Sequence, residues 1–375
     1  MLTLLGIAKL ILAVLALYLC DDPFGTCQFH QVIELEVTAE TSANASLGDL
    51  DGDGDLDIVL AKGRHWPVHD RVLMNDGHAN FTDAKNLGDA PDRTYSAVLA
   101  DLDNDGDLDI AISNDSPDKK LIYLNDGKAN FHVAGTWGEA KWNTRNAAVA
   151  DLNGDGYPDL IAANRNSPSY ICLNDGHGNF NESGTVKIPS ESATTIVPAD
   201  FDGDGFIDLA VPHRDGGQSR IFFNDGKGTF AKSKPFGPAK TSSRAAAAGD
   251  LNGDGMVDLV VGDEKRGSFL YMNQGLGEFA AELALKDMSR GVGAIAIGDM
   301  NRDGKQDIVV GYAASAGSVF FNRGKGTNFE QVRFGDGKGT VYGIALGDLN
   351  LDGFLDIVVG LSEASNKAFL SGPLR

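Results

Sequence analysis

The stretch Asp49-Leu-Asp-Gly-Asp-Gly-Asp-Leu-Asp57 decides how this chain folds. It places five carboxylates on alternate positions, which repel one another in water and which an apolar core would not accept. A Ca2+ ion takes six to eight oxygen ligands in irregular geometry and removes that repulsion. The first, third, fifth and ninth residues can supply side-chain oxygens, and the seventh its backbone carbonyl. The sequence therefore predicts a calcium-binding turn.

This turn differs from an EF-hand loop, which needs a bidentate Glu at its twelfth position. Here the twelfth residue is Leu60. The turn runs directly into Ile58-Val59-Leu60, which has the composition of a β-strand. We therefore expect the metal turn to connect two strands.

The nine-residue turn returns six more times, at intervals of 49 to 52 residues. A fixed period near 50 residues is typical of a stacked or radial repeat architecture. The candidate metal ligands are the alternate residues of the seven turns: Asp49, Asp51, Asp53, Asp55 and Asp57; Asp101, Asp103, Asp105, Asp107 and Asp109; Asp151, Asn153, Asp155, Tyr157 and Asp159; Asp200, Asp202, Asp204, Phe206 and Asp208; Asp250, Asn252, Asp254, Met256 and Asp258; Asp299, Asn301, Asp303, Lys305 and Asp307; Asp348, Asn350, Asp352, Phe354 and Asp356.

Each repeat reads as four strands, as the third one illustrates. Small apolar residues at 146–150 predict an inner strand, and residues 160–163 and 170–173 predict the second and third. Asn174-Asp-Gly then signals a hairpin, because positive φ is easily adopted there. A more polar fourth strand follows. Four antiparallel strands per roughly 50 residues form one blade of a β-propeller.

The two ends of the chain complete one another. The stretch Gln31–Val37 reads as a fourth strand, whereas Lys367–Leu370 reads as a third strand after which the chain stops. Pairing these two segments completes the last blade and removes exposed sheet edges. The sequence thus predicts an all-β fold, a propeller of seven four-stranded antiparallel blades closed by its N-terminal strand.

These repeats resemble the FG-GAP/VCBS class, whose best-known relatives are the integrin α-subunit heads. The resemblance rests on the Asp-x-[Asp/Asn]-x-Asp-Gly-x-x-Asp turns and the Asn-Asp-Gly-x-Gly-x-Phe hairpins, and it covers about residues 22–375. It implies a calcium-bearing propeller in secreted or surface proteins, but no single function. The sixth turn, with Arg302 and Lys305, and the seventh, with Leu351, depart most from the pattern, so we expect weaker calcium binding there.

The net charge and the N-terminal segment limit the partners and the cellular location that we expect. A formal charge of -21 argues against nucleic acid and anionic membrane surfaces as partners. Residues 1–20 hold the uninterrupted apolar run Leu10–Leu19, which fits a signal peptide in length, and a membrane anchor is the alternative. We expect an extracytoplasmic protein (secreted, periplasmic or at the cell surface), with the propeller at 22–375. The flanking residues leave the mode of attachment open.

Two roles for calcium can be weighed. A sensor couples one or two sites to an element with two conformations. Seven equivalent turns on one rim offer no such element, so we favour up to seven structural Ca2+ ions that stabilise the repeats.

A ligand site is predicted on the face opposite the turns. Six residues before each turn, at the mouth of the inner strand, stand Ala43, Tyr95, Arg145, Thr194, Arg244, Gly293 and Tyr342. Neighbouring loops add further candidates, and all of these suit an anionic or sugar-like ligand, although polar loops with no ligand are the alternative. The candidate ligand-binding residues are Arg64, His65, Trp66, Tyr95, Trp142, Arg145, His213, Arg214, Arg244 and Tyr342.

Three functional classes follow. The first is a non-catalytic binding or adhesion module for a glycan or an extracellular protein. The second is a carbohydrate-active enzyme, a polysaccharide lyase or hydrolase, in which His213 with Arg214, or His65 with Arg64, would act as base and charge-neutralising group. The third is a scaffold without a small ligand.

Overall fold

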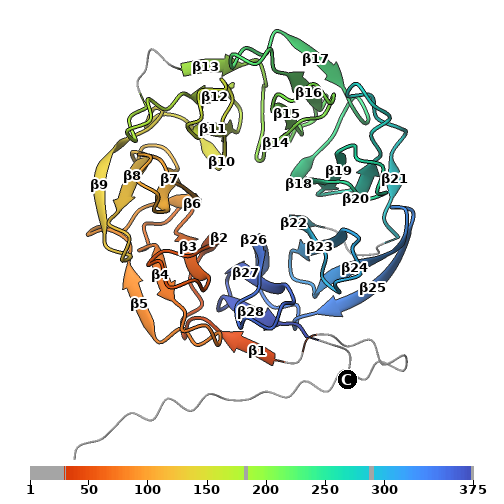
Figure 1. Ribbon diagram of the computed structural model, residues 1–375. Helices are drawn as coiled ribbons and strands as arrows, with labels where there is room; N and C mark the ends of the chain where they lie inside the picture. The colour runs from red at the N-terminus through yellow and green to blue at the C-terminus, as the bar shows by residue number, and fades with distance from the viewer. Residues whose placement is uncertain (1–28, 30, 181–184, 287–290, 373–375) are drawn as a thin grey trace, which may run out of the picture.

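The chain forms a closed seven-bladed β-propeller in the computed structural model (Figure 1). The structure describes residues 29, 31–180, 185–286 and 291–372. Within these residues, 28 strands form seven four-stranded sheets, all paired antiparallel. The fold class predicted from the sequence is confirmed. The strands of the first four blades are β2 (Ser42–Gly48), β3 (Asp57–Lys62), β4 (Arg71–Met74), β5 (Asp83–Asn86); β6 (Thr94–Ala100), β7 (Asp109–Asn114), β8 (Leu121–Asn125), β9 (Phe131–Thr136); β10 (Thr144–Ala150), β11 (Asp159–Asn164), β12 (Ser169–Cys172), β13 (Thr185–Ile188); β14 (Val197–Ala199), β15 (Asp208–Val211), β16 (Arg220–Phe223), β17 (Lys232–Pro235).

The seventh blade is assembled from both ends of the chain. Strand β1 pairs with β28 from Gln31 opposite Leu370 to Glu34 opposite Lys367. The predicted closure is confirmed, although the N-terminal strand ends at Glu34 and leaves Val37 fully exposed. The strands of the remaining blades are β18 (Ser243–Gly249), β19 (Asp258–Asp263), β20 (Gly267–Tyr271), β21 (Leu283–Ala284); β22 (Val292–Gly298), β23 (Asp307–Tyr312), β24 (Gly317–Gly324), β25 (Asn328–Phe334); β26 (Thr340–Gly347), β27 (Asp356–Ser362), β28 (Lys367–Leu370) and β1 (Gln31–Glu34).

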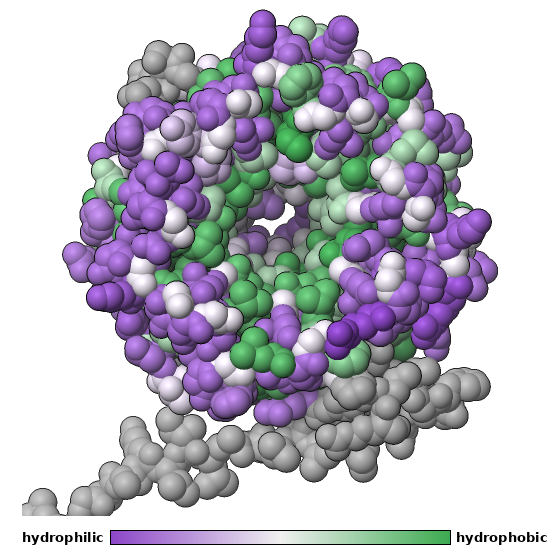
Figure 2. All heavy atoms as spheres, in the orientation of Figure 1, coloured by the Kyte–Doolittle hydropathy of each residue, from purple (hydrophilic) through white to green (hydrophobic). Residues whose placement is uncertain are grey.

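Burial changes from the axis to the rim within each blade. Every residue of β3, β11 and β19 is buried, because the second strand of a blade lies between two neighbouring blades. The fourth strands are polar and exposed, as all four residues of β5 are. Figure 2 shows the result on one face: hydrophilic residues on the perimeter, hydrophobic residues nearer the axis, and an opening at the centre of the ring.

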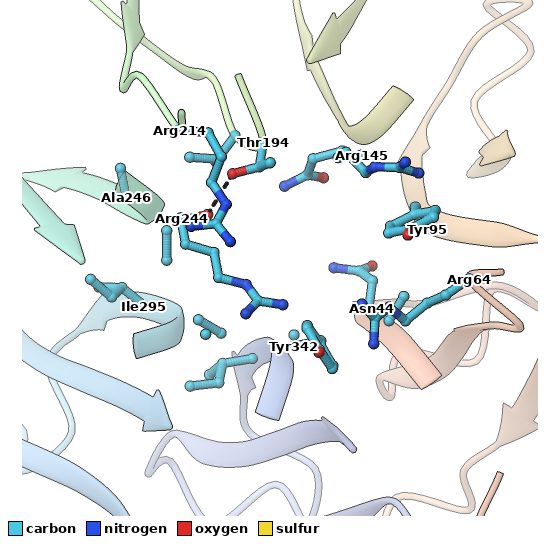
Figure 3. A pocket seen from close by; sticks show the side chains of 18 of the residues that line it. Asn44, Arg64, Tyr95, Arg145, Thr194, Arg214, Arg244, Ala246, Ile295 and Tyr342 are labelled. Carbon is cyan, nitrogen blue, oxygen red and sulfur yellow. Dashed lines mark hydrogen bonds between the residues drawn. The ribbon is translucent and has the colours of Figure 1, made fainter. Parts of the chain in front are cut away.

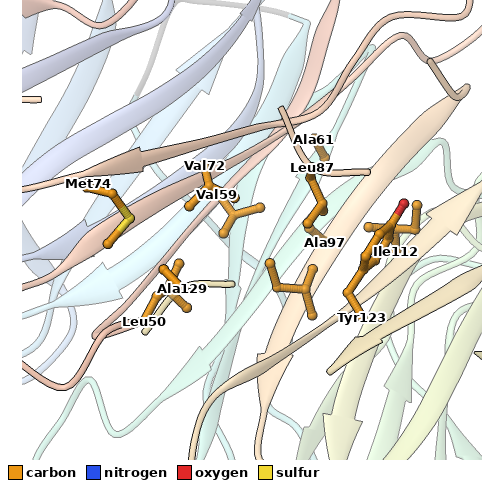
Figure 4. Close-up of a cluster of buried hydrophobic side chains, with 11 residues drawn as sticks. Leu50, Val59, Ala61, Val72, Met74, Leu87, Ala97, Ile112, Tyr123 and Ala129 are labelled. Atoms are coloured by element: carbon orange, nitrogen blue, oxygen red, sulfur yellow. The ribbon is translucent and has the colours of Figure 1, made fainter. Parts of the chain in front are cut away.

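The core is a ring of seven clusters, one between each pair of adjacent blades. Figure 4 shows the cluster between the first two blades, where Val59 and Val72 meet Ala97 and Ile112. Fully burying a Val or Ile side chain stabilises the fold by roughly 1.5–3 kcal/mol. Because each blade buries its faces only against its neighbours, the ring is the unit of stability.

The N-terminal prediction is not addressed by this structure. Residues 1–20, expected to be a signal peptide or membrane anchor, lie outside the described residues. The described part of the chain contains no helix with the length and hydrophobicity that a bilayer crossing requires.

Candidate functional site

The acidic turns and the predicted ligand site lie on opposite faces of the ring. Each acidic turn joins the first strand of a blade to the second, as between β2 and β3. The hairpin between the third and fourth strands returns to the same face. The loops between second and third strands, and the links between blades, therefore lie on the other face.

Backbone hydrogen bonds shape each acidic turn. In the first turn, Asp49 accepts from the N–H groups of Gly52 at 2.7 Å and Gly54 at 3.0 Å. Gly54 has φ of 93°, a conformation that glycine adopts without strain. The buried Asp57 accepts from the N–H groups of Leu50 at 3.0 Å and Asn75 at 2.8 Å. The ninth residue of all seven turns makes this pair of bonds.

Three turns bring enough carboxylates together to hold a cation. The groups are Asp49 with Asp51 and Asp53; Asp101 with Asp103 and Asp109; and Asp200 with Asp202 and Asp208, each with its ligand atoms within 4.8 Å of one another. This arrangement has the donor chemistry that a hard divalent cation prefers.

Unsatisfied oxygens support the same interpretation. Asp51, Asp55 and Asp103 each have a buried carboxylate oxygen without a hydrogen-bond partner. Burial, followed by the charges of Asp53, Asp51 and Asp49, raises the pKa of Asp55 to about 6. Burial and the neighbouring Asp105 likewise raise the pKa of Asp103. Crowded carboxylates with orphaned oxygens fit a Ca2+ ion, which would satisfy both the charge and the oxygens.

Four turns carry Asn at the third position. The Asn153 amide donates to Asp155 at 2.8 Å, and Asn252 donates to Asp254 at the same distance. The corresponding contacts are longer in the last two turns, at 3.5 Å for Asn301 and 3.3 Å for Asn350. These turns therefore offer fewer charged ligands, and their third ligand would be an amide oxygen.

The sixth turn already holds an internal cation. The Lys305 ammonium donates to Asp303 at 3.0 Å. Although burial acts in the opposite direction, the hydrogen bonds and charge of Lys305 lower the pKa of Asp303. In the other turns the seventh residue is Asp or carries a neutral side chain (Tyr157, Phe206, Met256 or Phe354). The sixth turn is thus the one in which a lysine would compete directly with a metal ion.

The hairpin asparagines join neighbouring blades, a role that the sequence analysis missed. The Asn125 amide donates to the carbonyl of Leu50 in the preceding blade at 2.8 Å. Asn75 donates in the same way to Leu349 across the closure of the ring. Asn174, Asn224, Asn273 and Asn322 repeat the bond. The hairpin motif predicts a turn. It does not predict a hydrogen bond to a residue about 70 positions away, because such a bond has no local signal in the sequence.

The opposite face has a cavity of about 200 Å³ on the axis (Figure 3). All seven residues that stand six positions before a turn line it, as the spacing predicts. In six of the seven inner strands that residue is the extra one of a β-bulge: Ala43, Tyr95, Arg145, Arg244, Gly293 and Tyr342. A bulge leaves one residue unpaired and redirects its side chain. The bulges therefore turn these side chains out of the regular alternation of the strand.

The cavity wall is cationic. Among the described residues, no acidic side chain lines it and five arginines do: Arg64, Arg145, Arg165, Arg214 and Arg244. Carboxylates next to the wall pair with four of them. Arg145 pairs with Asp115 at 2.7 Å, Arg165 with Asp215 at 3.0 Å, and Arg214 and Arg244 share Glu264 at 2.7 and 3.6 Å.

Two tyrosines hold the guanidinium groups. Arg64 and Arg244 lie 3.7 and 4.4 Å from the ring centre of Tyr342, and Arg145 lies 4.3 Å from that of Tyr95. Burial lowers the pKa of Arg244, and the nearby charges of Arg214 and Arg64 act in the same direction. Cation–π contacts fix the planes of these groups and leave their N–H edges available for a ligand.

The structure does not bring all the predicted ligand residues to this cavity. His65 lines it, with its ring nitrogen 2.9 Å from the Tyr95 hydroxyl. Trp66 follows in the same loop, but its side chain is 70% exposed and is not part of the wall. Trp142 is buried and stacks on Tyr170 at 4.3 Å, so its expected place beside the axis is wrong.

His213 is also absent from the axial wall. Its Nδ1 accepts from the N–H groups of Asp215 and Gly217, which ties the ring to its own loop. Arg165 does line the cavity, and the sequence places it, like Arg214, in the loop after a second strand, where further ligand-binding candidates were expected.

Comparison with known proteins adds the family. A family model described as FG-GAP-like repeat matches residues 49–112, 111–162, 151–211, 210–261, 250–310 and 299–359. The chain belongs to the FG-GAP-like repeat family. The resemblance inferred from the acidic turns is thereby confirmed. No curated protein matches this FG-GAP-like chain.

Solved structures share the fold of this FG-GAP-like propeller. One is an Agrocybe aegerita lectin described as specifically recognising non-reducing terminal N-acetylglucosamine, at 22% identity and a TM-score of 0.58, covering 78% of this chain and 80% of the lectin chain. Two others are structures of BBS1N in complex with ARL6DN, at 12% and 13% identity and TM-scores of 0.59 and 0.62, each covering 93% of this chain and 98% of that chain. At these identities the likeness concerns the fold alone.

Proposed function

We propose that this protein is an exported, calcium-stabilised propeller that binds an extracellular glycan or protein at its axial cavity, without catalysing a reaction. The observation that carries the proposal is the cavity itself. Of the residues that the structure describes, five arginines and no acidic residue line it, in a chain whose formal charge is -21. A cationic, concave site on the axis of an acidic protein has the character of a binding site.

The calcium part of the proposal rests on the acidic turns. Orphaned carboxylate oxygens and raised pKa values, in turns that fit Ca2+, support metal binding on the face away from the cavity. Separation of the two faces favours a structural role for the ions, because no metal turn contributes to the cavity wall. Weak multi-aspartate sites fill at millimolar extracellular Ca2+, which agrees with export.

The structural neighbours support a binding role in a general way. One propeller of this shape is a lectin for N-acetylglucosamine, and another was crystallised in complex with a second protein. Both a glycan and a protein are therefore reasonable ligand classes for this scaffold.

The test is a glycan array followed by pull-down from cell surfaces, with Ca2+ present. Thr194, whose hydroxyl donates to the Arg244 carbonyl at 3.2 Å in the cavity wall, is changed to Trp to fill the cavity. The control is Thr229→Trp, at an exposed position in a hairpin on the face of the acidic turns. We expect Thr194→Trp to abolish ligand capture while melting like the control. Capture that survives a filled cavity would contradict the proposal.

One contact keeps an enzymatic alternative in view. His65 lies between Asp115, at 3.2 Å from its Nδ1, and the Tyr95 hydroxyl, at 2.9 Å from its Nε2. With Arg64 and Arg145 nearby, this group has a candidate base and charge-neutralising partners for elimination on an acidic sugar. Incubation with polysaccharides, comparing wild type with His65→Ala, tests it: turnover that disappears in the variant would replace the binding proposal with a lyase.

A further inference from the structure

The charges around the axial cavity do not balance. Its five arginines meet three paired carboxylates, Asp115, Asp215 and Glu264. Arg64 has no carboxylate partner among the described residues, and its buried Nε has no hydrogen-bond partner there. Arg244 has only the more distant contact with Glu264, which Arg214 holds at 2.7 Å. Two guanidinium groups therefore remain in excess.

The two excess groups are held at one point. Arg64 and Arg244 both stack on Tyr342, and Figure 3 shows the tyrosine between them. Stacking occupies the faces of a guanidinium and leaves the donors in its plane free. The side chain of Arg244 is only 18% exposed, so its free donors meet little water. Such donors gain most from a charged acceptor.

The backbone also contributes to this arrangement. Arg244 and Tyr342 are each the extra residue of a β-bulge, on the inner strands of different blades. Arg64 reaches the same point from the loop after β3, in a third blade. Bulges interrupt the hydrogen-bond ladder and are frequent beside functional sites. Three blades thus converge on one cationic position.

The size of the cavity limits what can enter. About 200 Å³ is less than the 300–1,000 Å³ of a pocket for a drug-sized ligand. A flat protein surface would not reach the arginines, which are largely recessed. One sugar residue or a single acidic group fits.

We propose that the axial cavity recognises one oxyanion group, a carboxylate or a sulfate, on the terminal residue of an acidic glycan, bound by the N–H donors of Arg64 and Arg244. This inference rests on the proposed binding function and specifies its ligand. An oxyanion accepts charge-assisted hydrogen bonds from both guanidinium groups and relieves the repulsion between them. It also satisfies the Nε of Arg64, which otherwise stays buried without an acceptor.

Calorimetric titration of the full, calcium-loaded chain tests the inference. The probes are glucuronic acid and glucose 6-sulfate, with glucose as neutral control, inorganic sulfate and phosphate as free anions, and an acidic peptide as the other macromolecular class. We expect at least one charged sugar to bind at least roughly tenfold more tightly than glucose and than either free anion, because charge-assisted bonds are the stronger ones. Tighter binding of glucuronic acid would identify the recognised group as a carboxylate, and tighter binding of glucose 6-sulfate would identify it as a sulfate.

Variants assign the site. Arg64→Met and Arg244→Met each keep the length of the stem and remove the charge, and we expect roughly ten- to hundredfold weaker binding of the charged sugar with no change for glucose. Arg64→Lys keeps the charge without the planar fork and should fall between. The matched control is Arg266→Met, which removes an arginine stacked on Phe269 and paired with Glu282, outside the cavity.

The outcomes separate this inference from the proposed function. If glucose bound as tightly as the charged sugars, and Thr194→Trp abolished that binding, the cavity would still be a glycan site. The proposed recognition of an oxyanion would then be wrong. If the protein preferred the acidic peptide, or bound a free anion more tightly than both charged sugars, the proposal that its ligand is a glycan would be wrong. Binding unaffected by Thr194→Trp would overturn both. A melting curve for each variant shows that it is folded, and Arg64→Lys carries the test if either Met variant is not.

Discussion

On the face of the acidic turns, Asp51, Asp55 and Asp103 keep buried carboxylate oxygens that no described residue satisfies with a hydrogen bond. On the opposite face, the fully buried ammonium of Lys62 contacts two carboxylates, Glu36 and, at 2.7 Å, Glu40. The arginines of the axial cavity are also mostly paired there. The described residues of the first face thus leave carboxylate charge unbalanced, whereas those of the other face balance most of their charge and leave a small cationic excess. This difference supports the proposal that metal stabilises the first face and that a ligand completes the second.

Removing the metal should have the largest effect, and it should act through the turn face. With a site affinity of about 10⁻⁴ M and free Ca2+ of about 1 mM, each site contributes on the order of 1.4 kcal/mol to the free energy of unfolding. Seven sites would give at most about 10 kcal/mol, as much as an ordinary domain has in total. We expect EDTA to lower the melting temperature markedly in scanning calorimetry.

Magnesium is the control for this experiment. Mg2+ demands a tighter octahedral site, so it should restore less stability than Ca2+ at equal concentration. A sample in EDTA that melts like the calcium-loaded one would remove the proposed difference between the faces.

The second largest loss of stability is expected when a buried ion pair on the other face is broken. Lys62→Met leaves the side chain of Glu36, which is 10% exposed, without its cation at the closure of the ring. The Asn366 amide also donates to Glu36, so the change affects the contact between first and last blades. Removing one partner of a buried ion pair costs roughly 3–5 kcal/mol. Urea denaturation measures the loss.

The control is Lys85→Met, whose partner Asp83 is 63% exposed. An exposed pair contributes at most about 1 kcal/mol. Equal losses in the two variants would show that the closure network is no more important than a surface pair.

A pH effect of intermediate size is expected at Asp70. Complete burial, opposed by hydrogen bonds from the Lys62 N–H and the Thr94 hydroxyl, raises the pKa of this carboxyl to about 7. Because the folded-state pKa lies above the usual value of 3.8, the folded protein binds this proton more tightly than the unfolded chain does. The stability that Asp70 contributes is therefore complete below about pH 4 and is lost as the pH rises through 7, by about 4 kcal/mol.

Asp70→Asn should remove the pH dependence of stability that Asp70 contributes, without disturbing the local packing. In the last blade Asn366 occupies the corresponding place, accepting from the Leu361 N–H at 2.7 Å and donating to the Ser42 hydroxyl at 2.9 Å. An amide thus reproduces the bonds of the protonated acid. Unfolding free energies between pH 4 and pH 7 check the change, with the exposed Asp83→Asn as control. A slope that persists in Asp70→Asn would assign it to other groups.

The smallest predicted effect converts one turn into another. Lys305→Asp removes the lysine that pairs with Asp303 and gives the sixth turn the residue found at Asp55 and Asp107. We expect one additional bound Ca2+, or a tighter one, and about 1.4 kcal/mol more stability at millimolar Ca2+. Calcium titration with melting curves measures both.

In EDTA the Lys305→Asp variant should be no more stable than the wild type, because it gains a carboxylate and loses an ion pair. Lys227→Asp, in an exposed hairpin of the same face, controls for the change in net charge. A gain of the same size in that control, or in EDTA, would mean that the turn is not the cause.

The fold could be predicted from the sequence because its signals are local and repeated. Nine residues are enough to encode an acidic turn, since the bonds that Asp49 accepts from the N–H groups of Gly52 and Gly54 lie within it. The period of about 50 residues placed seven such turns, and the surplus strand at one end matched the missing strand at the other. The same spacing identified the seven residues at the axis.

The placement of the aromatic residues could not be read in this way. Trp142 stands three residues before Arg145 and resembles a binding residue, yet it stacks on Tyr170 inside the blade. Trp66 was a ligand-binding candidate and lies outside the cavity wall. The place of Trp142 depends on packing against a strand that is distant in sequence, for which the chain carries no local signal.

The sequence by itself determined the seven acidic turns, the number of blades and the closure of the ring, because each of these follows from contacts between neighbouring residues repeated at a fixed interval. Only the tertiary structure decided that bulged Arg244 and Tyr342 meet Arg64 from another blade, and that Arg244 shares its carboxylate with Arg214 while Arg64 has none among the described residues. The physical reason is that charge pairing on the axis depends on side-chain direction and on distances between blades, which arise only when all seven pack together.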